Sequence, residues 1–276
     1  MNEGAPAVER RNGFRIEVSS INLPFLGSRE EDHALFEYLL FDISSRGGWA
    51  GVRIAVPGWG VRKEYLNRGE IVDFHIPFQI DEESFHLAKV VWERWDDSLR
   101  AQVCGARLEK KARRAYPFHI SLSKAGIGID LRGFSSIEGL LLRVLKDSVL
   151  LKKGVLIYLK HLIPLFSRIS GYPHREFPEL KRCLLEDIRL KVEENKKALE
   201  TIFSNFQEAN WSFAELARHL DLNELLSATE SEIYPEIFNI AFETGAHISY
   251  IGAIKTLEKK LYCNYNLIVM MYLKAL

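Results

Sequence analysis

The chain has 276 residues, of which 47% are hydrophobic, so it is long enough for one large or two medium-sized domains with a true core, and its composition argues against disorder. Its 37 lysines and arginines equal its 37 aspartates and glutamates, which excludes a global field that would hold DNA and requires any anion site to be local. The cysteines Cys104, Cys183 and Cys263 are few and widely spaced, which argues for a reducing compartment and against a disulfide framework or a zinc site.

Neither a targeting segment nor a membrane span is evident in the sequence. The N-terminal residues 1–11 lack the apolar segment of a signal peptide. The most apolar window, residues 154–166, is too short for a membrane span and contains Lys160 and His161. We therefore expect a cytoplasmic protein without a membrane span.

The first part of the chain alternates apolar and polar residues with the period of two that is typical of strands. Residues 21–33 are polar and are expected to form a rather long connection between the first two strands. In the fifth strand the alternation favours a core position for Trp92, and the alternative is that Trp92 and Trp95 border a ligand. Six short strands separated by turn signals predict a small antiparallel barrel, with strands at 14–19, 34–41, 50–56, 72–78, 88–92 and 100–108.

Two arginines four residues apart lie at the start of this region. Arg11 and Arg15, preceded by Arg10, carry planar sets of N–H donors that match a phosphate or the O6/N7 edge of a guanine. Asn12-Gly13, between them, is a strong turn signal that can bring both guanidinium groups to one ligand. The segment therefore predicts a local anion site.

A second motif follows the second expected strand. Asp42 can accept the N–H donors on the other edge of a guanine, and Ser44 adds a small hydroxyl. Gly47 and Gly48 have no Cβ, so backbone can approach a base or a phosphate closely there. Together the two motifs suit a guanine-containing anion. Taken singly, each also fits a simpler interpretation, namely solvated charges near a terminus and a hairpin turn.

The order of these motifs resembles that of the PilZ domain, the bacterial receptor module for cyclic di-GMP. The resemblance covers residues 9–112 and includes the Arg11-xxx-Arg15 pair, Asp42-x-Ser44-x-x-Gly47, Val90-Val91-Trp92 and Gly105-Ala106-Arg107. It implies that the arginines lie on a flexible N-terminal arm that clamps guanines and phosphates. It also implies that the Asp/Ser/Gly motif lies on the surface of the barrel. The ligand-binding residues expected on this basis are Arg10, Arg11, Arg15, Asp42, Ser44, Gly47 and Gly48.

From about residue 135 the pattern becomes helical. Three capping boxes predict helix starts, at 135–138, 212–215 and 229–232. An apolar stripe from Leu180 to Phe206 predicts one amphipathic helix about 45 Å long at 1.5 Å per residue. The apolar residues 266–276 are expected to pack either in the helical core or against a second copy of the chain.

Catalytic patterns are missing from the sequence. The eight histidines lack metal-ligand spacing, and neither a GxSxG elbow nor a GxxxxGK[ST] phosphate loop occurs. The GGDEF-type and EAL-type motifs of enzymes that make and degrade cyclic di-GMP are also missing. We therefore expect a protein that is not an enzyme and that has no catalytic residues, metal or cofactor.

These observations predict an α+β protein. We expect a six-stranded antiparallel PilZ-like β-barrel with its arm in residues 1–115, a junction with a β-hairpin in residues 116–134, and an all-helical domain in residues 135–276. Its predicted function is that of a cyclic di-GMP receptor that couples ordering of the arm to the helical domain, to a protein partner, or to both. The alternative is a PilZ-like adaptor that binds no nucleotide and acts through protein contacts of its helices. A homodimer is compatible with either function.

Overall fold

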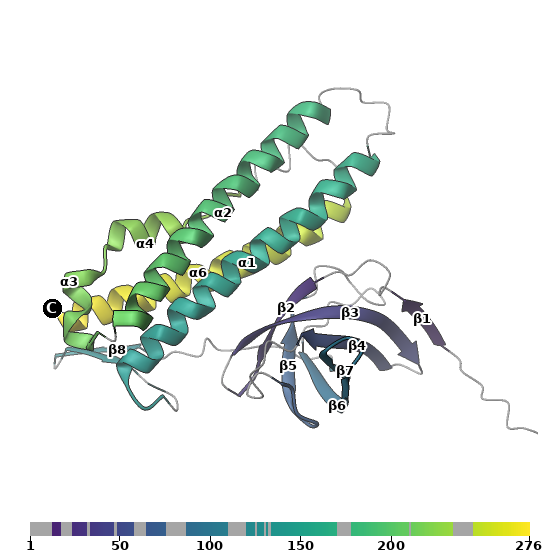
Figure 1. Ribbon diagram of the computed structural model, residues 1–276, viewed down its shortest axis with the longest axis horizontal. Helices are drawn as coiled ribbons and strands as arrows, with labels where there is room; N and C mark the ends of the chain where they lie inside the picture. The colour runs from purple at the N-terminus through teal and green to yellow at the C-terminus, as the bar shows by residue number, and fades with distance from the viewer. Residues whose placement is uncertain are drawn as a thin grey trace, which may run out of the picture. The chain divides into compact units, whose positions relative to one another are not determined.

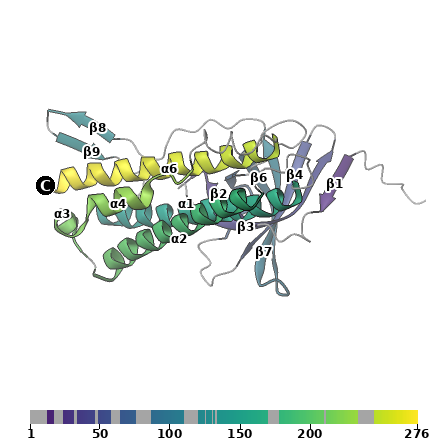
Figure 2. The ribbon, with the colours of Figure 1, turned by 90° about the horizontal axis from the view of Figure 1, so that it is seen from above.

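The computed structural model is drawn in Figure 1, and in Figure 2 from above. The chain divides into two compact units, one of residues 1–31 and 36–113 and one of residues 32–35 and 114–276. Each unit is described by itself. The residues described are 13–17, 24–31, 34–46, 49–57, 65–75, 87–109, 120–124, 126–129, 131, 134–169, 178–209, 211–233 and 245–276.

The first unit is a closed antiparallel β-barrel. The strands follow the order β1-β3-β2-β5-β6-β7-β4, and β4 pairs back with β3, which closes a ring of six strands. Strand β1 lies outside this ring and pairs with β3. The predicted barrel followed by helices is thus confirmed. Its strands are β1 (Gly13–Glu17), β2 (Pro24–Arg29), β3 (Leu35–Arg46), β4 (Trp49–Pro57), β5 (Ile71–Phe74), β6 (Leu87–Asp96) and β7 (Ala101–Glu109).

Strand β2 corrects the prediction of a polar connection at 21–33. The ring of six therefore includes β2. The first predicted strand, at 14–19, corresponds to β1, which lies outside the ring. The alternation test missed β2 because the four consecutive residues from Phe25 to Ser28 are all buried, so the strand shows no period of two. Gly27 is needed there, since a Cβ at this position would lie 2.6 Å from Cζ of Phe36.

Aromatic side chains fill much of the barrel core. The ring of Tyr38 lies 4.8 Å from that of Phe74 and 5.8 Å from that of Phe25, measured between centroids. Cys104 of β7 is also fully buried, and this burial raises the pKa of its thiol to about 12. The thiol is therefore neutral and acts as a small apolar core group.

The described residues of the second unit form a hairpin and six helical segments. Strands β8 and β9 pair in the segment where the sequence predicted a hairpin. Helix α1 packs against α2 and α6, and the three long helices lie alongside one another in both views (Figure 1 and Figure 2). The elements are β8 (Ile120–Ser123), β9 (Gly126–Ile129), α1 (Ile137–Ile169), α2 (Pro178–Ala209), the 3-10 helix η3 (Phe213–Glu215), α3 (Leu216–His219), α4 (Leu222–Thr229) and α6 (Gly245–Ala275).

Two of the three predicted helix starts are confirmed. Helix α1 begins after Ser136, whose Oγ accepts a hydrogen bond from the Gly139 N–H at 3.1 Å. The capping box of Ser212 and Glu215 forms at the start of η3. The third prediction is wrong, because Thr229 is the last residue of α4 and residues 230–233 are not helical. The carboxylate of Glu232, which was expected to cap a helix, binds a buried lysine instead.

The apolar stripe of α2 and the apolar C-terminal segment both contribute buried residues to the helical core. Val192, Leu199 and Phe206 of α2 are buried, as predicted for a single amphipathic helix. In α6, Leu267 and Met271 are buried, which confirms packing of the C-terminal segment within the helical core. Among the helices that the structure describes, none has a stretch long and apolar enough to cross a membrane.

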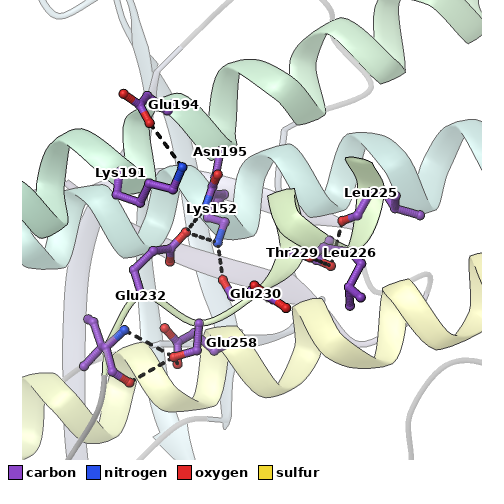
Figure 3. A network of polar contacts seen from close by, with 12 residues as sticks. Lys152, Lys191, Glu194, Asn195, Leu225, Leu226, Thr229, Glu230, Glu232 and Glu258 are labelled. Atoms are coloured by element: carbon purple, nitrogen blue, oxygen red, sulfur yellow. Dashed lines mark hydrogen bonds and ion pairs between the residues drawn. The ribbon is translucent and has the colours of Figure 1, made fainter. Parts of the chain in front are cut away.

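A buried polar network joins α1, α2 and the segment that follows α4 (Figure 3). The side chain of Lys152 is 0% exposed, and its Nζ donates to Oε1 of Glu232 at 2.6 Å and to the carbonyl of Glu230 at 2.8 Å. Nδ2 of Asn195 donates to the same Glu232 oxygen. Burial lowers the pKa of Lys152, and the charge of Glu232 opposes that shift. The network thus fixes residues 230–233 to the helices at a considerable desolvation cost.

Helix α6 adds a second acid to this region. Oε2 of Glu258 accepts hydrogen bonds from Ser231 Oγ at 2.8 Å and from Lys255 Nζ at 2.7 Å. Lys255 also donates to the carbonyl of Ile233. Burial raises the pKa of Glu258, because the desolvation of its carboxylate outweighs the stabilisation that Lys255 and Ser231 provide.

Replacing Lys152 by Met tests whether this network holds the helical unit together. The variant leaves the buried carboxylate of Glu232 without its cation, so we expect the free energy of unfolding to fall by about 3–5 kcal/mol. Urea unfolding followed by circular dichroism measures the change. The matched control is Lys191→Met, which removes an exposed partner of Glu194 and should cost less than about 1 kcal/mol. Equal, small losses in the two variants would contradict a structural role for the network.

The raised pKa of Glu258 predicts a pH dependence of stability. Above the ordinary value of 4.5 the unfolded chain loses this proton while the folded state retains it, so the contribution of Glu258 to the free energy of unfolding falls as pH rises toward its folded pKa. Glu258→Gln removes this titration. We expect the stability of the variant relative to the native protein to increase with pH through that window, as measured by urea unfolding at several pH values. Glu194→Gln, at an exposed position, is the control and should show no such trend.

Candidate functional site

Two rows of residues run around part of the outer surface of the barrel. A bulge between Leu40 and Asp42 shifts the register of β3, so that Leu40 and Ile43 face the core while Asp42 and Ser44 face outward. Cross-strand pairing then aligns outward residues from five strands. The Asp42 row consists of Glu17, Asp42, Arg53, Gly105 and Trp92, and the Ser44 row consists of Arg15, Ser44, Gly51, Arg107 and Lys89.

Two arginines meet at the carboxylate of Asp42. Nη2 of Arg15, from β1, donates a hydrogen bond to Oδ2 of Asp42 at 2.8 Å. Nε of Arg53, from β4, lies 2.6 Å from the same oxygen, as an ion pair whose angle does not suit a hydrogen bond. The side chain of Asp42 is only 4% exposed, whereas those of Arg15 and Arg53 are 49% and 32% exposed. The hydrogen bond and charge of Asp42 raise the pKa of Arg15, so this guanidinium keeps its charge.

The centre of the Ser44 row consists of small residues, the hydroxyl-bearing Ser44 and Gly51. Ser44 lies between Arg15 of β1 and Gly51 of β4 in the register. A Cβ at Gly51 would lie 3.5 Å from Ser44 Oγ and 3.3 Å from the Ala106 carbonyl, so glycine leaves this part of the surface open. Arg107 follows on β7, where it forms an ion pair with Glu109.

Trp92 does not lie in the core, which corrects the prediction from alternation. A register shift between Val90 and Trp92 carries the tryptophan to the outer face, where its side chain is 41% exposed. The indole lies against Gly105, since a Cβ at Gly105 would overlap its nitrogen. The far end of the Asp42 row is therefore a flat aromatic surface.

The structure brings together three of the seven predicted ligand-binding residues, Arg15, Asp42 and Ser44. The other four, Arg10, Arg11, Gly47 and Gly48, lie outside the described residues.

Arg53 was missed by the sequence analysis, although a signal for it exists. Residues 46 and 49 pair with each other, and counting outward from that pair along both strands places Arg53 opposite Asp42.

The arrangement suits a flat, polar anion. The guanidinium groups of Arg15 and Arg53, the Ser44 hydroxyl, the buried Asp42 carboxylate and Gly51 lie on the neighbouring strands β1, β3 and β4, and the exposed indole of Trp92 lies further around the barrel, against Gly105 of β7. Such groups bind phosphates, hydrogen-bond base edges and stack on base planes. Among the described residues, no group of three or more His, Cys, Asp or Glu side chains is placed to hold a metal ion.

Comparison of the chain with protein-family models, with curated proteins and with solved structures finds no match. The support for the candidate site therefore comes from its geometry and from the sequence motifs that form it.

Replacing Asp42 by Asn tests how much the barrel depends on this ion cluster. The variant leaves two converging guanidinium groups without a counter-charge, so we expect the free energy of unfolding to fall by about 1–3 kcal/mol. Glu17→Gln removes the exposed acid that pairs with Asp42 in the register of β1 and β3, and it should change stability by less than about 0.5 kcal/mol. Chemical denaturation of both variants makes the comparison, and a barrel equally stable in all three proteins would show that the cluster is not structural.

Proposed function

We propose that the barrel binds cyclic di-GMP and that the protein is a receptor for this second messenger. One observation carries the proposal: Arg15 and Asp42, which belong to two motifs 27 residues apart, meet at 2.8 Å on the outer face of the barrel. The resemblance of the same motifs to those of the PilZ domain supports the choice of ligand.

In the proposed complex each group has a distinct role. Arg15 and Arg11 bind guanine edges and phosphates, and Arg10 adds charge to the same arm. Asp42 accepts hydrogen bonds from the donor edge of a guanine. Ser44 and the backbone at Gly47 and Gly48 bind the remaining polar atoms, and a base can stack on the exposed indole of Trp92.

Ligand binding orders the N-terminal arm in this proposal. The ordering costs conformational entropy, which the charge-assisted hydrogen bonds have to exceed. The change at the arm then alters the surface that the protein offers to its helical domain or to a protein partner. The three cysteines are unpaired, which agrees with the cytoplasmic location that we propose. Dimerisation remains a further hypothesis for the helical domain.

A second candidate function is that of an adaptor that binds no nucleotide. The observation that favours it is the state of Asp42, whose carboxylate is only 4% exposed and already pairs with Arg15 and Arg53. In this function the cluster is purely structural, and the helical domain acts through protein contacts.

Isothermal titration of the purified protein with cyclic di-GMP separates the two functions. We expect saturable binding that GTP and cyclic di-AMP do not reproduce and that Arg15→Ala abolishes, because the variant loses a bidentate contact while the barrel stays folded. The matched control is Arg68→Ala, an exposed arginine in the loop between β4 and β5, which should bind as the native protein does. Absence of binding by the native protein would refute the receptor and favour the adaptor.

A further inference from the structure

The two arginines at Asp42 are not equivalent, although both approach Oδ2. Arg53 lies on β4, a member of the closed ring that pairs with β3 on one side and β7 on the other. Its guanidinium also lies over the ring of Phe41, 5.6 Å from the centroid. Arg15 lies on β1, which is outside the ring and pairs with β3, and its side chain is the more exposed of the two. Arg53 is thus the more firmly anchored partner.

Ligand binding as proposed above changes the contacts among Arg15, Asp42 and Arg53. Arg15 has to direct its donors to a guanine or a phosphate, and it then gives up part or all of its contact with Asp42. The carboxylate of Asp42 is almost fully buried, and removing the only cation from a buried carboxylate costs several kcal/mol. A second cation therefore has to remain beside Asp42 when its carboxylate accepts hydrogen bonds from the ligand.

We propose that Arg53 is the permanent counter-ion of Asp42 and that it releases Arg15 to bind the ligand. Recognition then proceeds as an exchange at one carboxylate, in which Arg15 leaves and a guanine edge takes its place while Arg53 stays. Arg53 is a positioning residue here, because it acts through Asp42. This inference rests on the proposed function and adds a residue and a regulatory step to the same site.

The inference predicts that the contribution of Arg15 to binding depends on Arg53. Without Arg53, Arg15 is the one cation at Asp42 among the described side chains, and it is held there. Arg53→Gln should therefore weaken binding of cyclic di-GMP by about tenfold or more. Arg53→Lys, which restores the positive charge, should recover most of the affinity. Arg68→Gln removes one exposed positive charge from the loop between β4 and β5, outside both rows, and it should change the affinity by less than about threefold.

The decisive experiment is a double-mutant cycle measured by isothermal titration with cyclic di-GMP. Arg15→Lys keeps binding measurable, and we expect it to weaken binding about tenfold in the native background but less than about threefold in the Arg53→Gln background. A merely structural role for Arg53 would lower the affinity without changing the effect of Arg15→Lys. Thermal unfolding of each variant establishes that it is folded, and Arg53→Met, which keeps the aliphatic stem over Phe41, replaces Arg53→Gln if the latter unfolds.

The outcomes distinguish the two proposals. Coupled losses together with rescue by Arg53→Lys support the exchange. Binding by the native protein with independent losses in the two variants, or with unchanged affinity in Arg53→Gln, overturns the exchange and leaves the receptor function standing. A native protein that does not bind cyclic di-GMP overturns both.

Discussion

The carboxylate of Asp42 is the group on which the outer face of the barrel depends. A bulge in β3 turns it outward, and the converging side chains of Arg15 and Arg53 neutralise it while it remains 4% exposed. A buried carboxylate is tolerated only with such partners, so the position of both arginines follows from that of the acid. Because Arg15 lies on a strand outside the closed ring, the same interaction also links β1 to the barrel.

Much of the fold could be predicted from the sequence, for identifiable reasons. Strand β4 alternates between buried and partly exposed residues from Ala50 to Ile54, and the capping box at Ser212 is local, so both could be found from neighbouring residues. Strand β2 was missed because it is buried on both faces, and Trp92 was misplaced because a register shift reverses the alternation. The failed helix start at Thr229 has a tertiary cause, since Glu232 binds a lysine 80 residues away. Such causes lie in contacts between residues that are far apart in the sequence, so they leave no local pattern.

The candidate site shows the same division between local and tertiary information. The Arg15 and Asp42 motifs could be found by residue type and spacing, and their meeting is a consequence of β1 pairing with β3. Arg53 has no motif of its own. Its role appears only when the strands are placed in register, which makes it the cross-strand neighbour of Asp42. Each unit pairs a cation with a buried carboxylate, but the two cations differ in exposure. Lys152 is fully buried in the helical core, whereas Arg15 is half exposed and is free to exchange partners in the proposed mechanism.

The most direct test of the receptor is a map of amide chemical-shift changes in the native protein as cyclic di-GMP is added. We expect saturable changes concentrated at Arg15, Asp42, Ser44 and Gly51, which are neighbours on β1, β3 and β4. Changes of this kind would place the ligand on the two outer rows. A spectrum that stays unchanged in a large excess of cyclic di-GMP would contradict binding of this ligand by the barrel. Changes confined to the helical unit would contradict it as well.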